Sequence, residues 1–353
     1  MQKVLMKGNE AIAEAAIRAG CKHFFGYPIT PQTEVAAYMS KKMPKIGGVY
    51  LQAESEVAAI NMVYGASGVG ARAMTSSSSP GISLKAEGIS YLAATDLPCV
   101  IVNIVRGGPG LGGIQPAQSD YLQATKGGGH GDYQMVVFAP ASIQELADLT
   151  MEAFDCADYY RMPVMIMGDG VLGQMMEPVE FREGTTKKLQ EKTWALTGTE
   201  NKREPNIVNS LLIDPTVLEQ LVLERSKKYE KIEQQEARYE AMDIEDADIV
   251  CVAYGITARI VQSAMVQARK KGIKVGLIRP ITLWPFPKDI FKQAAKTAKT
   301  FLSVEMSMGQ MIDDIKIASE CKLPVEFFGR TGGVVPSPAE VLQKIEEIAG
   351  GLK

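Results

Sequence analysis

The chain has 353 residues, of which 46% are hydrophobic and 22% charged, and its formal net charge is −3. This composition is typical of a globular protein that is long enough for two domains with a sizeable core. The small charge and the lack of basic runs argue against a nucleic-acid or membrane-surface partner, and no apolar stretch suits a signal peptide or a membrane span, so we expect a cytoplasmic protein.

The first part of the chain alternates short apolar runs with helical patterns. The apolar runs are residues 23–27, 49–52, 73–75, 99–105, 135–138 and 164–167. The helical patterns are residues 10–19, 31–42, 56–65 and 143–157. Several runs are apolar throughout, as in strands that are buried on both faces of a parallel sheet. The alternation predicts a doubly wound α/β domain over residues 1–181.

The middle of the chain, residues 182–245, has a different character. Residues 182–210 are polar, and residues 218–242 have the pattern of one long charged helix. The apolar positions of this helix form a narrow stripe made of Leu218, Leu221, Val222, Tyr229, Ile232 and Tyr239. We expect a connecting segment that packs on a neighbour with one face.

A second, smaller α/β unit is predicted over residues 246–353. It offers strands at 249–254, 275–278 and 300–304, and a helix that Thr257 could cap and that runs to about residue 271. Ser337 and Glu340 form a capping box around Pro338 at the first helical position. The unit is too small for a complete dinucleotide-binding enzyme and suits an accessory domain.

Several glycine-rich segments resemble phosphate-binding or metal-binding loops. Residues 65–70 lie at the end of a helical pattern, and neither 107–113 nor 127–131 is followed by the Lys-Ser/Thr of a phosphate-binding loop. Gly168-Asp169-Gly170 resembles a metal motif of thiamin enzymes, but no Asn pair follows it. We interpret Asp169 as a turn residue at a strand end and predict no metal site.

The five cysteines, Cys21, Cys99, Cys156, Cys251 and Cys321, are widely spaced and form no CxxC pair. The sequence therefore signals neither an iron–sulfur cluster nor a zinc site on this chain. Cys99 and Cys251 lie in or beside apolar runs, so we expect them to be reduced core residues.

Several segments, spread over almost the whole chain, share their order and spacing with one enzyme family. They are residues 26–31 (GYPITP), 52–59 (QAESEVAA), 74–81 (MTSSSSPG), 103–110 (NIVRGGPG), 118–120 (QSD), 304–311 (VEMSMGQM) and 329–335 (GRTGGVV). Together they resemble the alpha-type subunit of thiamin-diphosphate-dependent 2-oxoacid:ferredoxin oxidoreductases, above all the branched-chain (2-ketoisovalerate) type. The resemblance implies a doubly wound, thiamin-diphosphate-binding pyrimidine domain followed by a transketolase C-terminal-like α/β domain.

The activity implied by this resemblance is oxidative decarboxylation of a 2-oxoacid, such as 3-methyl-2-oxobutanoate, to acyl-CoA with ferredoxin as electron acceptor. It implies a hetero-oligomer in which a beta-type subunit holds the diphosphate and Mg²⁺, with gamma and ferredoxin-like subunits and iron–sulfur clusters on the partners. Coenzyme A is the implied co-substrate. The alternatives are a 2-oxoglutarate-specific enzyme, the beta-type chain of a lipoamide-linked 2-oxoacid dehydrogenase, and a non-catalytic scaffold subunit.

Glu56 is the candidate cofactor-activating residue. Thiamin diphosphate is activated through its own aminopyrimidine, which needs a carboxyl group hydrogen-bonded to a ring nitrogen. Such a carboxyl works best in a dry pocket, where burial raises its pKa. Glu56 begins a predicted helix and matches the family's glutamate. Glu54 remains a rival, and a carboxylate at a helix start can also simply complement the helix dipole.

Thr30 and Arg106 are the candidate substrate-orienting residues. Thr30 precedes Pro31, which favours an N-cap, and the resemblance implies that it also helps to hold the substrate's carboxylate. Arg106 follows the apolar run at 99–105, at the strand end where α/β sheets bind ligands. Its guanidinium can hold a carboxylate in a bidentate fork. The structural alternative for Arg106 is an ion pair with Asp96 or Asp120.

Successive hydroxyls at residues 75–79 follow a predicted strand, and such groups are seldom buried without partners. The resemblance implies that this loop and a proline before it surround the aminopyrimidine. The candidate cofactor-contacting residues are Pro28, Thr75, Ser76, Ser77 and Ser78, together with Glu56. At least one hydroxyl of the run is expected to cap the next helix.

Two further features are less specific. Residues 107–132 form a long Gly-rich loop, a kind of segment that is usually functional or disordered, and we expect it to border the substrate or a partner. A lone histidine in it, His130, is more often structural than catalytic. Glu305 precedes the Met-rich stretch 306–311, which suits either adaptable contacts or ordinary core filling.

Overall fold

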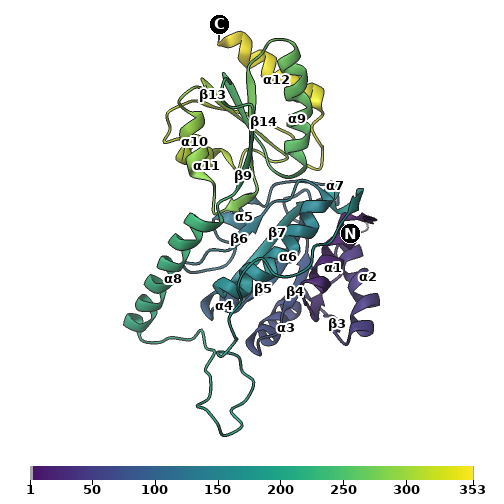
Figure 1. Ribbon diagram of the computed structural model, residues 1–353, viewed down its shortest axis with the longest axis vertical. Coiled ribbons are helices and arrows are strands. Elements are labelled where there is room, and N and C mark those ends of the chain that lie inside the picture. The colour runs from purple at the N-terminus through teal and green to yellow at the C-terminus, as the bar shows by residue number, and fades with distance from the viewer. Residues whose placement is uncertain (1–2, 353) are drawn as a thin grey trace.

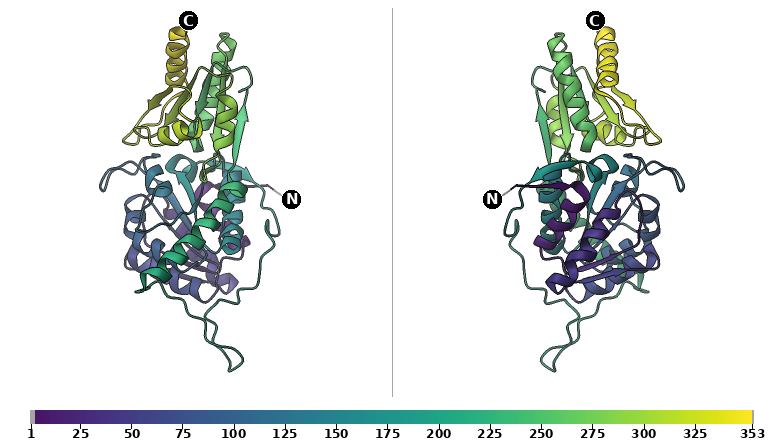
Figure 2. Two further views of the ribbon diagram at one scale, coloured as in Figure 1. Left: turned by 90° about the vertical axis from the view of Figure 1, so that its left-hand side faces the viewer. Right: turned by 90° about the vertical axis from the view of Figure 1, so that its right-hand side faces the viewer.

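A computed structural model describes residues 3–352, and Figure 1 shows two α/β units stacked along the long axis of the molecule. The first is built on a seven-stranded sheet and the second on a five-stranded sheet. The described C-terminal end lies at the far tip of the second unit, whereas the N-terminal end lies beside the junction (Figures 1 and 2). Within residues 3–352 no helix combines the length and apolar character that a membrane span requires.

The sheet of the first unit is parallel except at one edge. Its strands in spatial order are β12 (Thr282–Trp284), β6 (Val136–Phe138), β7 (Pro163–Asp169), β5 (Cys99–Val105), β4 (Ala73–Ser77), β2 (His23–Gly26) and β3 (Val49–Gln52). Every residue of β4, β5, β6 and β7 is buried, as expected for strands covered on both faces. The edge strand β12 pairs antiparallel with β6.

Helices cover both faces of this sheet, which confirms the predicted doubly wound arrangement. α1 packs on α6, while α3 packs on α4. The helices are α1 (Gly8–Arg18), α2 (Thr33–Lys42), α3 (Glu56–Gly68), α4 (Pro80–Ala94), α5 (Tyr121–Thr125), α6 (Ile143–Tyr160) and α7 (Gly170–Gln174), with a 3-10 turn η1 (Met43–Ile46). β1 (Val4–Lys7) and β8 (Met176–Val179) form a separate antiparallel pair.

The second unit has strands on a smaller sheet, flanked by short and long helices. The strands in order are β14 (Val325–Gly329), β13 (Thr300–Glu305), β10 (Ile249–Val252), β11 (Val275–Pro280) and β9 (Tyr239–Met242). The helices are α9 (Gly255–Lys270), α10 (Lys288–Ala294), α11 (Ile312–Ala318) and α12 (Pro338–Gly351). The predicted capping box is confirmed, because Ser337 Oγ accepts from the Glu340 N–H and the Glu340 carboxylate accepts from the Ser337 N–H.

Two predicted boundaries are wrong. The helix expected over 218–242 is α8 (Pro215–Glu236), and the chain then forms β9, whose ladder with β11 supplies main-chain bonds that helical periodicity does not reveal. Thr257 does not cap α9, because the helix already begins at Gly255, with Tyr254 at the N-cap. Residues 182–214 run mainly as an extended loop on the outside of the first unit (Figure 1).

Gln118, which is only 2% exposed, forms hydrogen bonds across the junction of the two units. Its Nε2 donates to the Tyr254 carbonyl at 3.0 Å, and its Oε1 accepts from Thr257 Oγ1 at 2.8 Å and from the Met306 N–H at 2.9 Å. A buried amide with all these bonds made is costly to separate from its partners. The loop after β5 therefore holds the second unit over the carboxyl edge of the first sheet.

Candidate functional site

Loops that leave one edge of the first sheet build the candidate site. β2, β3, β4 and β5 are parallel, so their carboxyl ends lie at the same edge, where open α/β sheets bind ligands. A cavity of about 440 Å³ opens there. It is lined by Tyr27, Pro28, Ile29, Thr30, Thr33, Glu56, Pro80, Gly81, Leu84, Arg106 and Leu111. The structure thus brings together four predicted site residues, Pro28, Thr30, Glu56 and Arg106.

Glu56 is the first residue of α3 and is only 6% exposed. Ser55 caps the helix, because its Oγ accepts from the Ala58 N–H at 3.1 Å. The cap frees the Glu56 side chain from that task and leaves its carboxyl at the cavity wall. Glu54, the rival carboxylate, is exposed and does not line the cavity. Burial and position both favour Glu56 as the acid that could meet a ligand.

Gly81 allows α4 to approach this carboxyl. A Cβ atom on Gly81 would stand 2.9 Å from Glu56 Oε1 and 2.0 Å from Ser77 Oγ. Any side chain at position 81 would therefore displace the acid or the hydroxyl. No sequence pattern singles out Gly81, Leu84 or Leu111, although they form much of the apolar lining of this cavity.

Arg106 directly follows β5 and is 6% exposed. Its Nη1 donates to the Thr30 carbonyl at 2.9 Å and its Nη2 to the Leu111 carbonyl at 2.8 Å, while its buried Nε has no partner. Among the described residues Arg106 makes no ion pair. The expected structural alternative is wrong, because Asp96 pairs with Arg225 and Lys228 and Asp120 accepts from Asn103.

Thr30 lines the cavity but does not cap a helix. α2 begins at Thr33 rather than at Pro31, and Gln32 occupies the N-cap position. The predicted capping role is therefore wrong. Thr30 lines the cavity together with Arg106, and its contact with a substrate carboxylate stays a prediction.

The hydroxyls of residues 75–78, at the end of β4 and just after it, lie behind the cavity wall. Thr75, Ser76, Ser77 and Ser78 are fully buried, and none of them lines the cavity. Ser76 Oγ donates to Gln32 Oε1 at 2.5 Å, but the hydroxyl oxygens of the other three have no partner within the described chain. Buried polar atoms without partners are uncommon and call for a ligand or water. Their contact with a cofactor stays a prediction.

Ser79, the last of the successive hydroxyl residues, does not make the capping bond that the sequence predicts for this run. It occupies the N-cap position of α4, with φ of 32°, but its side chain makes no capping bond. Instead its Oγ accepts from the Arg106 N–H at 3.0 Å, and its own N–H donates to Asn103 Oδ1 at 3.1 Å. These bonds join the ends of β4 and β5 and so hold Arg106 in place.

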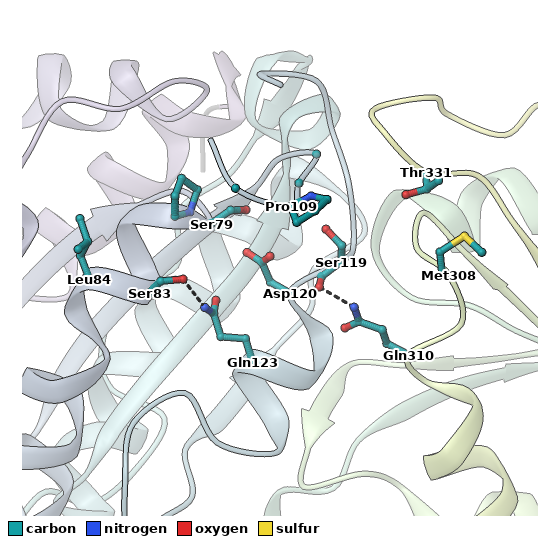
Figure 3. A pocket seen from close by; sticks show the side chains of 14 residues that line it. Ser79, Ser83, Leu84, Pro109, Ser119, Asp120, Gln123, Met308, Gln310 and Thr331 are labelled. Carbon is teal, nitrogen blue, oxygen red and sulfur yellow. Dashed lines mark hydrogen bonds between the residues drawn. The ribbon is translucent and has the colours of Figure 1, made fainter. Parts of the chain in front are cut away.

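A second cavity of about 690 Å³ adjoins the first and shares Pro80 and Leu84 with it. Figure 3 shows side chains from both units converging on it, with Asp120 near the middle and Met308 and Thr331 across from Leu84. Burial raises the pKa of Asp120, against the effect of hydrogen bonds from Asn103 and Ser79. Residues 107–132 line much of this cavity. The prediction of one continuous loop is wrong, because α5 forms within this segment, and its expected role beside a substrate or partner stays a prediction.

Glu305 shapes the loop that reaches this second cavity. Its carboxylate is fully buried and accepts from the hydroxyls of Ser303 and Ser307 and from the N–H groups of Gln310 and Met311. Met308 on the same loop is 77% exposed, so the Met-rich stretch is only partly core.

His130 lies elsewhere, with Nδ1 3.5 Å from Ser90 Oγ, beside a separate cavity next to α8.

Asp169 belongs to the junction between the units. Its Oδ1 accepts from the Val171 and Leu172 N–H groups, which confirms its expected role at a strand end. The Ile256 N–H of the second unit also bonds to this carboxylate. Residues 3–352 contain no cluster of three or more His, Cys, Asp and Glu side chains that could hold a metal ion.

Asp169→Asn should change how stability depends on pH. Burial raises the pKa of Asp169 from 3.8 to about 6, so the folded chain holds this proton more tightly than the unfolded chain. Stability therefore falls as pH rises from about 4 to about 6. Asn keeps a capping oxygen without the charge, and it should remove that slope and stabilise the chain at pH 7 by at most about 3 kcal/mol.

The measurement is denaturant unfolding of the chain at several pH values between 4 and 7. Asp214→Asn is the matched control, because Asp214 caps α8 in the same way but is exposed and its pKa is lowered by hydrogen bonds from Thr216. The control should keep the slope. A loss of stability in Asp169→Asn at pH 7, or loss of activity in the assembled enzyme, would instead indicate a role for the charge, such as metal binding.

The chemistry of the first cavity fits a thiamin pyrimidine. A buried carboxyl offers a partner for a ring nitrogen, and apolar groups from Pro28, Leu84 and Leu111 offer contact for a flat ring. The nearby hydroxyls of residues 75–78 include three without partners in the described chain. Arg106 supplies a cation for an acid substrate beside it. No described cluster offers a comparable site for a diphosphate-bound metal.

Comparisons with known proteins match the chain to a thiamine-diphosphate-binding family. Residues 14–248 match the family model described as pyruvate flavodoxin/ferredoxin oxidoreductase, thiamine-diphosphate-binding, and residues 247–341 match the pyruvate:ferredoxin oxidoreductase core domain II. The chain is 51% identical to ketoisovalerate oxidoreductase subunit VorB of Methanothermobacter marburgensis, over 99% of both chains. It is 36% identical to 2-oxoglutarate synthase subunit KorA of Methanocaldococcus jannaschii, over 97% of this chain and 98% of that one.

One solved structure is similar throughout the chain. It is 2-oxoglutarate:ferredoxin oxidoreductase from Magnetococcus marinus with 2-oxoglutarate, coenzyme A and succinyl-CoA bound, at a TM-score of 0.87 and 28% identity. The similarity covers 98% of this chain but 65% of that longer chain. Because a family model matches well over half of its length and a relative is 51% identical from end to end, the chain belongs to the pyruvate flavodoxin/ferredoxin oxidoreductase family, with a thiamine-diphosphate-binding domain followed by core domain II.

Proposed function

We propose that this chain supplies the aminopyrimidine half of a thiamin diphosphate site in an enzyme that oxidatively decarboxylates a branched-chain 2-oxoacid. The substrate is 3-methyl-2-oxobutanoate, the acyl group passes to coenzyme A, and ferredoxin receives the electrons. The observation that carries the proposal is a buried Glu56 carboxyl in the same cavity as Arg106. The 51% identity to a ketoisovalerate oxidoreductase subunit supports the choice of substrate.

The residues of this chain would have distinct tasks. Thiamin diphosphate, when bound, supplies the nucleophilic carbon and the electron sink for decarboxylation. The Glu56 carboxyl shares a proton with the pyrimidine ring nitrogen, and burial keeps that hydrogen bond free of competing water. Arg106 and Thr30 hold the carboxylate of the 2-oxoacid, while Leu84 and Leu111 restrict water at the cavity mouth.

A partner subunit would complete the site. Apolar side chains that line the cavity are exposed in this chain: Leu111 is 82% exposed, Leu84 53% and Tyr27 37%. Such a rim is characteristic of a surface that another protein covers. The relatives are named as subunits, which supports the same conclusion. We propose a beta-type partner that holds the diphosphate and Mg²⁺, and gamma and ferredoxin-like partners that carry the iron–sulfur clusters.

The charge of the cavity favours a monocarboxylate substrate. Arg106 is the one basic residue among the side chains that line it, whereas 2-oxoglutarate has a second carboxylate that needs its own cation or donors. The similarity to 2-oxoglutarate synthase subunits keeps that acid as the second candidate. The family match favours ferredoxin reduction over transfer to lipoamide and favours a catalytic over a scaffold subunit.

The test is to purify the chain alone and assembled with its partners and to measure 2-oxoacid-dependent and coenzyme-A-dependent ferredoxin reduction. The assembled enzyme should turn over 3-methyl-2-oxobutanoate with the highest kcat/KM, and the chain alone should be inactive. A higher kcat/KM for 2-oxoglutarate would reassign the substrate. Turnover by the isolated chain with thiamin diphosphate and Mg²⁺, or by the partners without this chain, would contradict the half-site.

A further inference from the structure

A fully buried lysine lies behind the proposed site. Lys85 is on α4, and its exposed fraction is 0%, although its neighbours Ser83 and Leu84 face the cavities. It shares the inward side of α4 with Ile82 and Ile89, three positions before it and four after it. A lysine in such a place is unusual and requires a compensating partner.

Close packing between α3 and α4 holds Lys85 against the start of α3. At Gly88, one turn after Lys85, an added Cβ would stand 2.5 Å from Ile60 Cγ2 of α3. Lys85 Nζ donates to the main-chain carbonyl of Glu56 at 3.4 Å. No other hydrogen bond and no ion pair of Lys85 occurs in the part of the chain that the structure describes. One long hydrogen bond thus serves a group that carries three donors.

The electrostatics of this place are unfavourable unless Glu56 compensates. A cation beside the first residues of α3 faces the positive end of the helix dipole. Burial lowers the pKa of Lys85 to about 8, and the negative charge of Glu56 opposes that shift. Glu56 is the one titratable group found to act on Lys85 from the elements packed around it. The charges of Lys85 and Glu56 therefore depend on each other.

We propose that Lys85 is a positioning residue for Glu56: its buried ammonium bonds to the Glu56 main-chain carbonyl, holds the first turn of α3 and places a positive charge behind the Glu56 side chain. The inference rests on the proposed role of Glu56 and adds the group that sets its charge. In general, burial favours the protonated form of a carboxyl, and a cation beside it favours the ionised form. A group that shares a proton with a ring nitrogen needs both forms within reach, so a buried acid with a nearby cation suits this role.

The first test is the pH profile of kcat/KM for the assembled enzyme. Lys85→Met, close in length but neutral, should move the acidic limb upward by about one pH unit or more, and Lys85→Arg should restore it in part. Lys41→Met on α2 is the control, because Lys41 is exposed and does not line the cavity. A Lys85→Met profile that coincides with the wild-type profile would overturn the proposal.

The second test needs no activity, so it separates this inference from the proposed function. Lys85→Met is made in the wild type and in Glu56→Gln, and the loss in thermal stability is compared. If Lys85 and Glu56 interact, Lys85→Met should lower thermal stability more in the wild type, where it leaves Glu56 without its cation, than in the Glu56→Gln background. Equal losses in the two backgrounds would show that Lys85 acts independently of Glu56. If the stability effects of Lys85→Met and Glu56→Gln are coupled but Glu56→Gln leaves turnover unchanged, the proposed function is contradicted while the interaction of Lys85 with Glu56 stands.

Discussion

Glu56→Gln in the assembled enzyme should lower kcat/KM by about 10²–10⁴-fold, the usual contribution of a positioned proton-sharing group. Gln has nearly the same shape and can still accept or donate a hydrogen bond, but it cannot exchange a proton with a ring nitrogen. Because Glu56 is buried at the cavity wall, water cannot easily take over this role. The measurement is steady-state ferredoxin reduction with saturating coenzyme A and thiamin diphosphate.

Glu54→Gln is the matched control for this prediction. Glu54 lies two residues earlier, is exposed and does not line the cavity, so its substitution should leave kcat/KM near the wild-type value. Size-exclusion chromatography of both variants establishes whether the subunits still assemble. If Glu54→Gln loses the activity and Glu56→Gln keeps it, the assignment of the two acids must be exchanged. If neither substitution matters, the carboxyl-activated site is wrong.

The main architecture is predictable from sequence because burial on both faces leaves a continuous apolar signal. The run at 99–105 becomes β5, buried along its whole length, and the run at 164–167 lies within β7. β9 and β12 lack such a signal, since each is a short strand at a sheet edge. Their partners are distant in sequence, and β12 even joins the sheet of the first unit.

The candidate site is partly predictable for a topological reason. Thr30, Glu56 and Arg106 each follow a parallel strand or open the helix after it, so the sheet itself gathers them at one edge. The side chains around Asp120 are harder to foresee, because Met308 and Gln310 reach that cavity from a segment almost two hundred positions later. The docking of the second unit brings them together, through Gln118 and through the hydrogen bonds of Gln310 to Ser119 and Leu122.

The local predictions that fail do so where a tertiary contact replaces a local one. Thr257 has the right residue type for an N-cap, yet its hydroxyl donates to Gln118 across the junction. Ser79 stands at an N-cap position but bonds to the Arg106 main chain. In both cases the side chain stabilises an interface that one-dimensional patterns do not contain. Capping preferences are modest in energy, about 1 kcal/mol, so such contacts can override them.

Arg106→Met should lower kcat/KM for the 2-oxoacid by about 30-fold or more, which corresponds to the loss of roughly 2–5 kcal/mol expected when one partner of a buried charged pair is removed. The structure holds the guanidinium by the carbonyls of Thr30 and Leu111, so the cation is positioned before the substrate arrives. The loss should appear chiefly as a higher KM for the 2-oxoacid, with the KM for coenzyme A unchanged. Arg106→Lys keeps the charge but not the planar fork, and it should recover only part of the loss.

A purely structural role for Arg106 predicts a different pattern. If the residue only joined the Thr30 and Leu111 loops, its loss would disturb the whole cavity, and kcat and the KM values of both substrates would change together. Arg18→Met is the control, since Arg18 lies exposed on α1, forms an ion pair with Glu14 one turn away, stacks over the Phe181 ring and does not line the cavity. The two roles also differ in their response to the acid: a carboxylate-binding Arg106 makes the neutral ester of the 2-oxoacid a poor substrate for the wild type. The same ester should lose little further in Arg106→Met, because the charge that distinguishes acid from ester is then absent from the cavity. Equal losses for acid and ester would assign Arg106 to the framework of the site rather than to its substrate.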